Sequence, residues 1–434
     1  MSSPNNAAIA RSAARRLSLE ALAAGTVGNV VEWYDFGLYG FFVPTLAHLF
    51  FPSADHIAAL IGAYGGFAIG FAMRPIGGAV LGHLGDRIGR RFLLVFSVVM
   101  MGGCTAAIAV LPTYGQVGLA APILLLLVRI FQGFSVGGEF TGSVSYLVET
   151  ASPPRRGFAG SFANIGSTGG MLLAAGVAAA TVTFAHGSAL YSWAWRIPFL
   201  LGGVLGILGY LLRRRLSHPG YEPDAKARKH PDPPLKRALK RSPRTMIYAT
   251  LFTTGYGIVN YLTMVFLPTY ASGFGDIPHG TALGIATAAQ GVALVMVPIA
   301  GWLTDNVMRR RTLLIAAFAA EFAVAWIAFA LVRAVGIAGL WIAQLLFGFL
   351  LALVMGTAPA MLAEMFPGEY RLSGYSVSFN IGLGIGGGTA PMVATALIAL
   401  SGNLLAPAWY LMLAGLFGAG AIFMVKDRSR EPLR

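Results

Sequence analysis

The chain contains twelve apolar stretches, each long enough to cross a lipid bilayer. A helix needs about 20 predominantly apolar residues to span the hydrocarbon core of a membrane. Of the 434 residues, 56% are hydrophobic and only 11% are charged, which is too little charge to cover the surface of a water-soluble protein. We therefore predict an all-α membrane protein with transmembrane helices over residues 20–47, 57–82, 92–112, 117–147, 158–183, 194–213, 245–271, 281–304, 312–332, 336–364, 373–399 and 405–425.

Lys and Arg residues cluster in every second connection between these stretches. Basic groups occur at both termini, in the long central connection and after the second, fourth, eighth and tenth stretches, whereas the opposite side carries only Arg196 and Arg333. Because cytoplasmic loops carry an excess of Lys and Arg, we expect both termini to be cytoplasmic and the chain to be a multi-pass protein of a bacterial inner membrane. The net charge of +14 reflects this topology, and no nucleic-acid partner is expected.

The chain carries several motifs twice, at an offset of about 220 residues, which is typical of transporters built from two repeats. Asn164–Ile165–Gly166, for example, recurs as Asn380–Ile381–Gly382. This duplication predicts two pseudo-symmetric six-helix bundles that rock around a central site. The expected bounds are 1–213 for the N-terminal bundle, 214–244 for a basic cytoplasmic linker and 245–434 for the C-terminal bundle.

Five motifs together resemble a known family of membrane proteins. GHLGDRIGRR (82–91) resembles the signature of the major facilitator superfamily. The segments GNVVEWYDFGLYGFF (28–42), MRPIGG (73–78), RIFQGFSVGGEFTG (129–142) and RRGFAGSF (155–162) are similar to the metabolite:proton symporters within it. The resemblance covers the whole chain. It implies proton-coupled transport of a small solute, which in this family is citrate, 2-oxoglutarate or another dicarboxylate, shikimate, or proline and betaine.

The segment after the second stretch carries residues suited to a cytoplasmic gate. Glycine permits close helix approach, and Asp86 can cap the next helix and pair with an arginine of the other half. The resemblance implies that this cluster locks one state of the carrier; the alternative is a set of basic membrane anchors. The second copy is degraded, because Asn306 and Met308 replace Arg87 and Gly89. The expected gating residues are Gly82, Asp86, Arg87, Gly89, Arg90, Arg91, Glu149, Arg156, Asp305, Arg309, Glu364 and Arg371.

Five ionisable residues lie deep in the expected N-terminal bundle: Glu32, Asp35, Arg74, Arg129 and Glu139. An ionisable side chain at the bilayer centre costs roughly 2.5–3.5 kcal/mol, so these groups are expected to face each other or a water-filled cavity. Three acids against two bases leave one negative charge, which one proton neutralises. Glu32, Asp35 and Glu139 are therefore the expected proton-coupling residues. In the competing interpretation, one acid of the first helix only holds neighbouring helices, and Glu139 is a gating partner.

Arg129 is the expected anchor for a substrate carboxylate, because a guanidinium group binds carboxylates through two parallel hydrogen bonds. Arg74 either shares that role or binds an acid of the first helix. In the predicted helix over 117–147, Arg129, Gln132, Val136 and Glu139 follow helical spacing along one broad face. The C-terminal half is expected to contribute neutral recognition, with ordinary interhelical hydrogen bonding as the alternative. The expected substrate-binding residues are Tyr39, Arg74, Arg129, Gln132, Asn164, Tyr256, Asn260 and Asn380.

These observations predict a secondary active transporter that takes up a small carboxylate-bearing metabolite together with protons. The alternative is uptake of a zwitterionic osmolyte such as proline or betaine, for which Trp33, Tyr34 and Tyr39 offer a cation-binding surface. No metal-ligand cluster, nucleophile–base pair or phosphate-binding loop is recognisable, so neither an enzyme nor a cofactor is expected, and the proton gradient supplies the driving force. The expected partners are substrate, protons and the lipid bilayer, with a monomeric carrier. Glu321, midway along the ninth helix, has no assigned partner.

Overall fold

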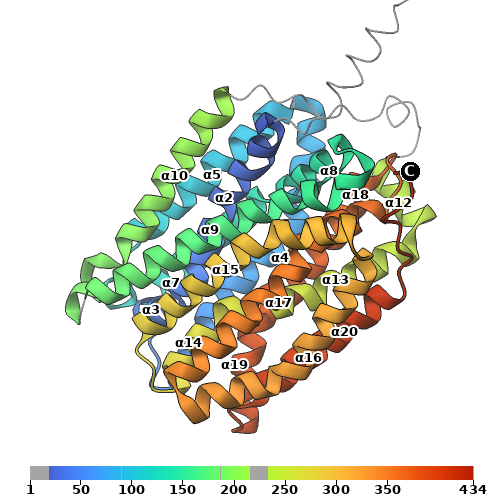
Figure 1. Ribbon diagram of the computed structural model, residues 1–434. Coiled ribbons are helices and arrows are strands. Elements are labelled where there is room, and N and C mark those ends of the chain that lie inside the picture. Colours follow the sequence, from blue (N-terminus) through green and yellow to red (C-terminus); the bar gives the residue numbers. More distant parts are fainter. Residues whose placement is uncertain (1–18, 89, 186, 216–232, 434) are drawn as a thin grey trace, which may run out of the picture.

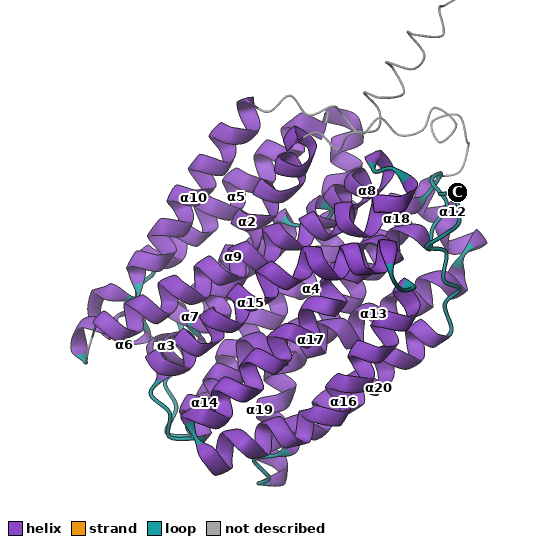
Figure 2. Ribbon diagram, in the orientation of Figure 1, coloured by secondary structure: helices purple, strands orange, loops and turns teal. Residues whose placement is uncertain are grey.

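The computed structural model describes residues 19–88, 90–185, 187–215 and 233–433. Every regular element in this part of the chain is helical, as Figure 2 shows. The N-terminal half contains α2 (Leu19–Phe41), α3 (Val43–Phe50), α4 (His56–Ile88), α5 (Arg90–Val110), α6 (Tyr114–Val117), α7 (Ala120–Ser135), α8 (Glu139–Thr150), η1 (Pro153–Arg155), α9 (Arg156–Phe184), η2 (Leu190–Ala194) and α10 (Arg196–Arg215).

The C-terminal half begins after a short linker helix, α12 (Pro234–Arg241). Two of its membrane helices are interrupted by five-residue π-helical segments, a local distortion often found at functional sites. Its elements are α13 (Pro243–Tyr261), η3 (Leu262–Phe266), α14 (Leu267–Phe274), α15 (His279–Asn306), α16 (Arg310–Val335), α17 (Ile337–Glu364), α18 (Arg371–Leu383), η4 (Gly384–Gly388), α19 (Thr389–Ser401) and α20 (Ala406–Phe423).

Each of the twelve expected stretches coincides with one helix or with consecutive helical segments. Within the described residues, ten helices are long and apolar enough to cross a membrane. The prediction of an all-α membrane fold is therefore confirmed. The side of the membrane on which the termini lie stays a prediction from the distribution of Lys and Arg.

The fourth membrane helix differs from the sequence prediction, because it is broken. α7 ends at Ser135 and α8 begins at Glu139, so residues 136–138 leave the helical path. Glycine accounts for the close packing around this break: a Cβ atom added to Gly77 of α4 would lie 1.9 Å from the carbonyl oxygen of Phe134. The prediction of one continuous polar face was therefore wrong. Arg129 and Gln132 stay together on α7, while Glu139 begins a separate helix.

The two halves pack along one long interface. In Figure 1 the blue-to-green half lies beside the yellow-to-red half, and α9 contacts both α2 of its own half and α15 of the other. The linker is attached to the C-terminal half, because Arg237 of α12 donates a 3.2 Å hydrogen bond to Glu369, in the turn between α17 and α18. α9 begins at Arg156, and α15 ends one residue after Asp305, so both helices of the interface have an expected gating residue at one end.

Candidate functional site

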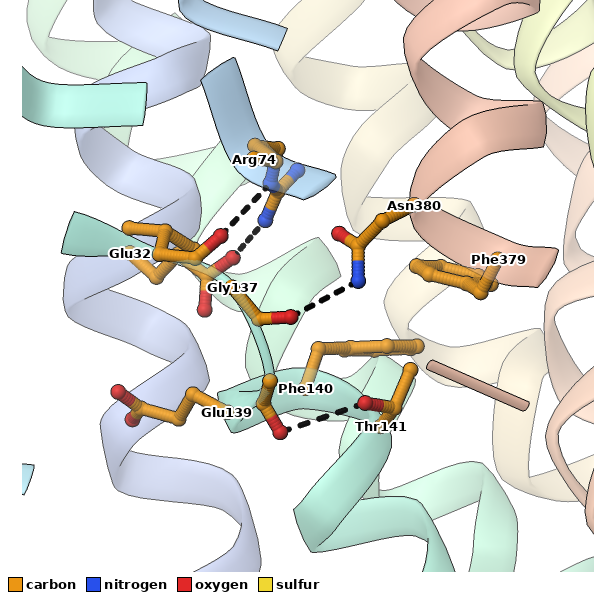
Figure 3. Close-up of a pocket in the computed structure, with 10 residues that line it drawn as sticks. Glu32, Arg74, Gly137, Glu139, Phe140, Thr141, Phe379 and Asn380 are labelled. Carbon is orange, nitrogen blue, oxygen red and sulfur yellow. Dashed lines mark hydrogen bonds and ion pairs between the residues drawn. The ribbon is translucent and has the colours of Figure 1, made fainter. Parts of the chain in front are cut away.

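The centre of the N-terminal half contains an ion pair between two helices. Glu32 of α2 accepts a hydrogen bond from Arg74 of α4, and both residues are at most 2% exposed. Figure 3 shows the two side chains pointing toward one another at the edge of a pocket. Of the two roles considered for Arg74, this geometry supports binding of a first-helix carboxylate.

Asp35 lies one turn further along α2 in a separate set of hydrogen bonds. Its carboxylate accepts one from Thr105 of α5 and a second, 2.8 Å long, from the amide nitrogen of Gln132. Arg129 in turn donates a 2.9 Å hydrogen bond to the side-chain oxygen of Gln132. Asp35 and Arg129 are therefore linked through a neutral amide. Thr105 was not anticipated, because a lone threonine in an apolar helix carries no distinctive sequence signal.

Aromatic rings surround the two guanidinium groups. Phe36 lies between them, with the ring centroid 4.8 Å from Cζ of Arg74 and 5.1 Å from Cζ of Arg129. Arg129 also lies 4.2 Å from the ring centroid of Tyr39, whose hydroxyl donates a hydrogen bond to the carbonyl of Ala63. Cations are attracted to such ring faces. These rings therefore help to hold two positive charges in an apolar interior.

A narrow pocket lies beside the ion pair, with about 160 Å³ of space between its atoms but no room for a water-sized molecule. The site is therefore closed in this conformation, and a substrate enters it only when the surrounding helices move apart. Its wall combines the ion pair, the helix break and one helix of the other half (Figure 3). The lining residues are Glu32, Arg74, Val136, Gly137, Gly138, Glu139, Phe140, Thr141, Phe379 and Asn380.

The pocket brings together only part of the expected site. Glu32, Arg74, Glu139 and Asn380 line it, whereas Asp35, Arg129 and Gln132 form the neighbouring network. Tyr256 and Asn260 are buried in α13 and do not line this pocket. Phe140 and Phe379, whose stacked ring centroids are 5.0 Å apart, line it without having been anticipated, because aromatic residues are common throughout the apolar stretches.

The repeated asparagines make equivalent contacts across the interface. Asn164 of α9 donates a 2.6 Å hydrogen bond to the carbonyl of Met355 in α17. Asn380 of α18 donates a 2.9 Å hydrogen bond to the carbonyl of Gly137 in the helix break. In both cases the side chain binds the backbone of the opposite half. For Asn380 this contact supports the interhelical alternative, and the substrate-binding role expected of Asn164 stays a prediction.

The expected gating residues form ion pairs that cross between the halves. Arg156 lies 3.5 Å from Glu364, and Arg371 lies 2.5 Å from Glu149. Each arginine is buried, and each pairs with the acid of the other repeat. Arg156 also donates a 2.9 Å hydrogen bond to the carbonyl of Glu431 near the C-terminus. The four residues therefore join the two halves at the end of the bundle that carries the basic connections.

The aspartate of the second copy of the gate motif is well bonded. Asp305 accepts 2.8 Å hydrogen bonds from the backbone N–H groups of Gly157 and Phe158 at the start of α9. A carboxylate is stabilised at a helix N-terminus. Arg310 pairs with Asp305 at 2.8 Å and with Glu364 at 3.0 Å.

The side chain of Arg309 is exposed, whereas that of Arg310 is fully buried. The gating role of Arg309 stays a prediction. The repeat alignment placed Arg309 opposite Arg90, but α16 begins at Arg310, which turns that side chain toward the acids. In the first copy, Gly89 lies outside the described residues. Gly82 lies within α4, whereas the side chains of Asp86, Arg87, Arg90 and Arg91 lie outside the described part of the structure.

Glu321 is fully buried in α16, and neither of its carboxylate oxygens has a hydrogen-bond partner within the described part of the chain. Its helix packs against α17 and α20, away from the pocket.

Helices of both halves line the pocket beside the buried ion pair, and salt bridges join the two halves at one end. Binding sites between two halves are typical of secondary transporters. The sequence profile of the Major Facilitator Superfamily matches residues 25–320 and 256–434. The chain belongs to this superfamily, as the motifs predicted, and is a secondary transporter of its type.

Two relatives are named as transporters of proline and betaine. The chain is 32% identical over 425 residues to the proline/betaine transporter of Salmonella typhimurium, covering 96% of this chain and 85% of the relative. It is also 32% identical over 428 residues to the glycine betaine/proline/ectoine/pipecolic acid transporter OusA of Dickeya dadantii, covering 96% and 84%. The fold is similar to that of the proton:xylose symporter XylE, with a TM-score of 0.76, 17% identity and coverage of 95% and 97%.

Proposed function

We propose that this protein takes up a zwitterionic osmolyte, such as proline or betaine, together with protons across a bacterial inner membrane. The names of relatives at 32% identity over nearly the whole chain favour this alternative over the di- or tricarboxylate that the sequence first suggested. The structural observation that carries the proposal is the ion pair of Glu32 and Arg74 in the pocket wall.

This ion pair matches a zwitterion group for group. A substrate carboxylate replaces Glu32 on the Arg74 guanidinium, and the substrate cation replaces Arg74 beside Glu32. The stacked rings of Phe140 and Phe379 in the pocket wall offer faces for that cation. A bound zwitterion therefore replaces the ion pair between Glu32 and Arg74 with one contact of its own to each of these residues.

The charge balance of the site also disfavours a dicarboxylate. The pocket and the network behind it contain two guanidinium groups and three carboxyl groups. One proton brings this set to neutrality, and a bound zwitterion leaves it neutral. A dicarboxylate adds two negative charges, and an uncompensated charge in the membrane interior costs roughly 2.5–3.5 kcal/mol.

Proton coupling follows from the same groups. We assign the coupling proton to Asp35, because its partners Gln132 and Thr105 are neutral donors, whereas a proton on Glu32 removes an ion pair. Protonation of Asp35 permits the loaded carrier to reorient, and loss of the proton on the cytoplasmic side favours release. The positive charge of Arg129 then compensates the negative charge of Asp35, to which Arg129 is linked through the Gln132 amide.

Uptake by the purified carrier in liposomes tests the proposal. With an inward proton gradient, labelled proline is expected to accumulate, and unlabelled betaine is expected to compete with it. Citrate and 2-oxoglutarate, at equal concentration, serve as carboxylates without the cation and are expected to leave proline uptake unchanged. Accumulation of labelled citrate, with no uptake of proline or betaine, would refute the osmolyte assignment.

A further inference from the structure

The broken fourth helix is held from both sides through its own backbone carbonyls. From the N-terminal half of the protein, Nε of Arg74 donates a 3.4 Å hydrogen bond to the carbonyl of Val136. From the C-terminal half, Asn380 and Ser376 of α18 donate hydrogen bonds of 2.9 and 3.2 Å to the carbonyl of Gly137. These carbonyls are available because residues 136–138 are outside the helical hydrogen-bonding pattern.

The two carbonyls belong to adjacent residues. Only the N and Cα atoms of Gly137 separate the two carbonyl carbons, so a displacement of the break moves both carbonyls and changes both sets of contacts. The side chain that binds Val136 is the one that pairs with Glu32, and the side chain that binds Gly137 belongs to the opposite half of the protein. A continuous chain of contacts thus runs from the ion pair in the pocket to α18 of the opposite half.

The corresponding asparagine of the first repeat, Asn164, does not contact a helix break. Asn164 also crosses the interface, but it binds the carbonyl of Met355 within α17, a helix without a break at that position. Neither Asn164 nor Met355 lines the pocket. The repeat therefore provides one asparagine that contacts the break and a matched one that does not.

We infer that Asn380, with Ser376, is a positioning residue that couples the Glu32–Arg74 pair to the opposite half through the helix break. When a substrate carboxylate binds Arg74, the guanidinium moves away from the Val136 carbonyl. The helix break then shifts, and its hydrogen bonds to α18 weaken. Release of Asn380 from Gly137 then permits α8 and α18 to separate. Asn380 acts on the substrate site through the backbone and is distinct in role from a substrate ligand.

The first experiment compares Asn380→Ala with Asn164→Ala in liposomes, with labelled proline as the probe. Two rates are measured for each variant: accumulation driven by the proton gradient and exchange without a gradient. For Asn380→Ala, the ratio of accumulation to exchange is expected to fall roughly 2- to 30-fold, the range of typical coupling energies. For Asn164→Ala, both rates are expected to fall in proportion. A raised KM with an unchanged ratio in Asn380→Ala makes it a substrate ligand and overturns the inference.

The second experiment needs no substrate, and it separates this inference from the proposed function on which its transport readout rests. Thermal midpoints are measured for Glu32→Gln, Asn380→Ala and the double variant, and for the same cycle with Asn164→Ala. Coupled residues give non-additive effects. The Asn380 cycle is expected to depart from additivity by at least about 1 °C, and the Asn164 cycle is expected to be additive.

Additive shifts in the Asn380 cycle, or equal departures in both cycles, overturn the inference whatever the transported solute is. Conversely, absence of proline and betaine uptake by the wild-type carrier overturns the proposed function alone, because the thermal cycles remain decisive for the role of Asn380.

Discussion

At the scale of single residues, the two acids of the first membrane helix have different partners despite their spacing of three positions. Glu32 pairs with a charged group, Arg74, while Asp35 is bonded by a hydroxyl and an amide. Removing the charge of Asp35 therefore leaves neutral hydrogen bonds in place, whereas removing that of Glu32 leaves a guanidinium without its carboxylate. This asymmetry is the reason to assign the coupling proton to Asp35.

Replacement of Asp35 by Asn keeps an acceptor oxygen for Gln132 and places an amide NH₂ toward the Thr105 hydroxyl, which can accept a hydrogen bond while donating to the carbonyl of Met101. The exchangeable proton is removed. We expect Asp35→Asn to abolish accumulation of labelled proline against a gradient while retaining exchange at a rate within about tenfold of wild type, since a factor of ten corresponds to 1.4 kcal/mol. Gradient-driven accumulation at the wild-type level in this variant contradicts the assignment. Glu32→Gln, the comparison variant, is expected to impair exchange as well.

Two consecutive arginines at the start of α16 provide a second residue-scale test. Arg310 is buried between Asp305 and Glu364, whereas Arg309 is exposed. Removal of one partner from a buried ion pair costs about 3–5 kcal/mol, and most exposed substitutions change stability by less than about 0.5 kcal/mol. We therefore expect Arg310→Ala to lower the thermal midpoint of the purified protein markedly and Arg309→Ala to leave it unchanged. Equal midpoints for the two variants contradict the assignment of Arg310 to the gate.

At the scale of elements, glycine determines how closely α4 approaches the broken fourth helix. A Cβ atom at Gly77 would lie 1.9 Å from the Phe134 carbonyl oxygen, and one at Gly137 would lie 2.0 Å from Cα of Gly78. The colliding atoms belong to the backbone, so they cannot move away as a flexible side chain does. This close approach brings Arg74 within reach of the break.

We expect Gly77→Ala to push α4 and α7 apart and to destabilise the protein by about 1–3 kcal/mol, the usual cost of overpacking. Gly65, on the same helix, has open space where a Cβ atom would be placed. Gly65→Ala is therefore the matched control and is expected to be neutral or slightly stabilising, because alanine favours helices. Thermal unfolding and proline exchange of both variants measure the effect. Similar losses in the two variants contradict the packing argument.

At the scale of the whole molecule, the two halves are joined by the exchanged ion pairs of their repeats. Glu149 of α8 pairs with Arg371 of α18, and Arg156 of α9 pairs with Glu364 of α17. Opening of this end requires both pairs to break, since each spans the interface. The equilibrium between open and closed states therefore depends on charges contributed by both halves.

Charge reversal tests this dependence. Glu149→Arg is expected to reduce proline accumulation at least about tenfold, because two positive charges then face each other where an ion pair was, and like-charge contacts cost several kcal/mol. Adding Arg371→Glu restores the pair in reverse and is expected to recover most of the activity. The exposed pair of Lys426 and Glu431 provides the control, since Lys426→Glu is expected to have little effect. A double variant as inactive as the single one contradicts the gating role.

Much of the site could be predicted because buried charge is rare in membrane helices. Glu32, Asp35, Arg74 and Arg129 stand out in apolar stretches, and the structure brings all four into two adjoining networks. The partners that complete these networks could not be predicted. Thr105, Phe140 and Phe379 are ordinary residues of apolar helices, and only their position in space distinguishes them.

Local hydropathy and charge specify where helices form, how many repeats there are and which ends carry basic groups, because each of these depends on short segments in contact with lipid or water. The break in the fourth helix, the choice of Arg310 over Arg309 and the crossing of the gate pairs depend on the tertiary structure. Each is decided by a close approach between segments far apart in the chain, where backbone carbonyls and buried charges must find partners in the opposite element.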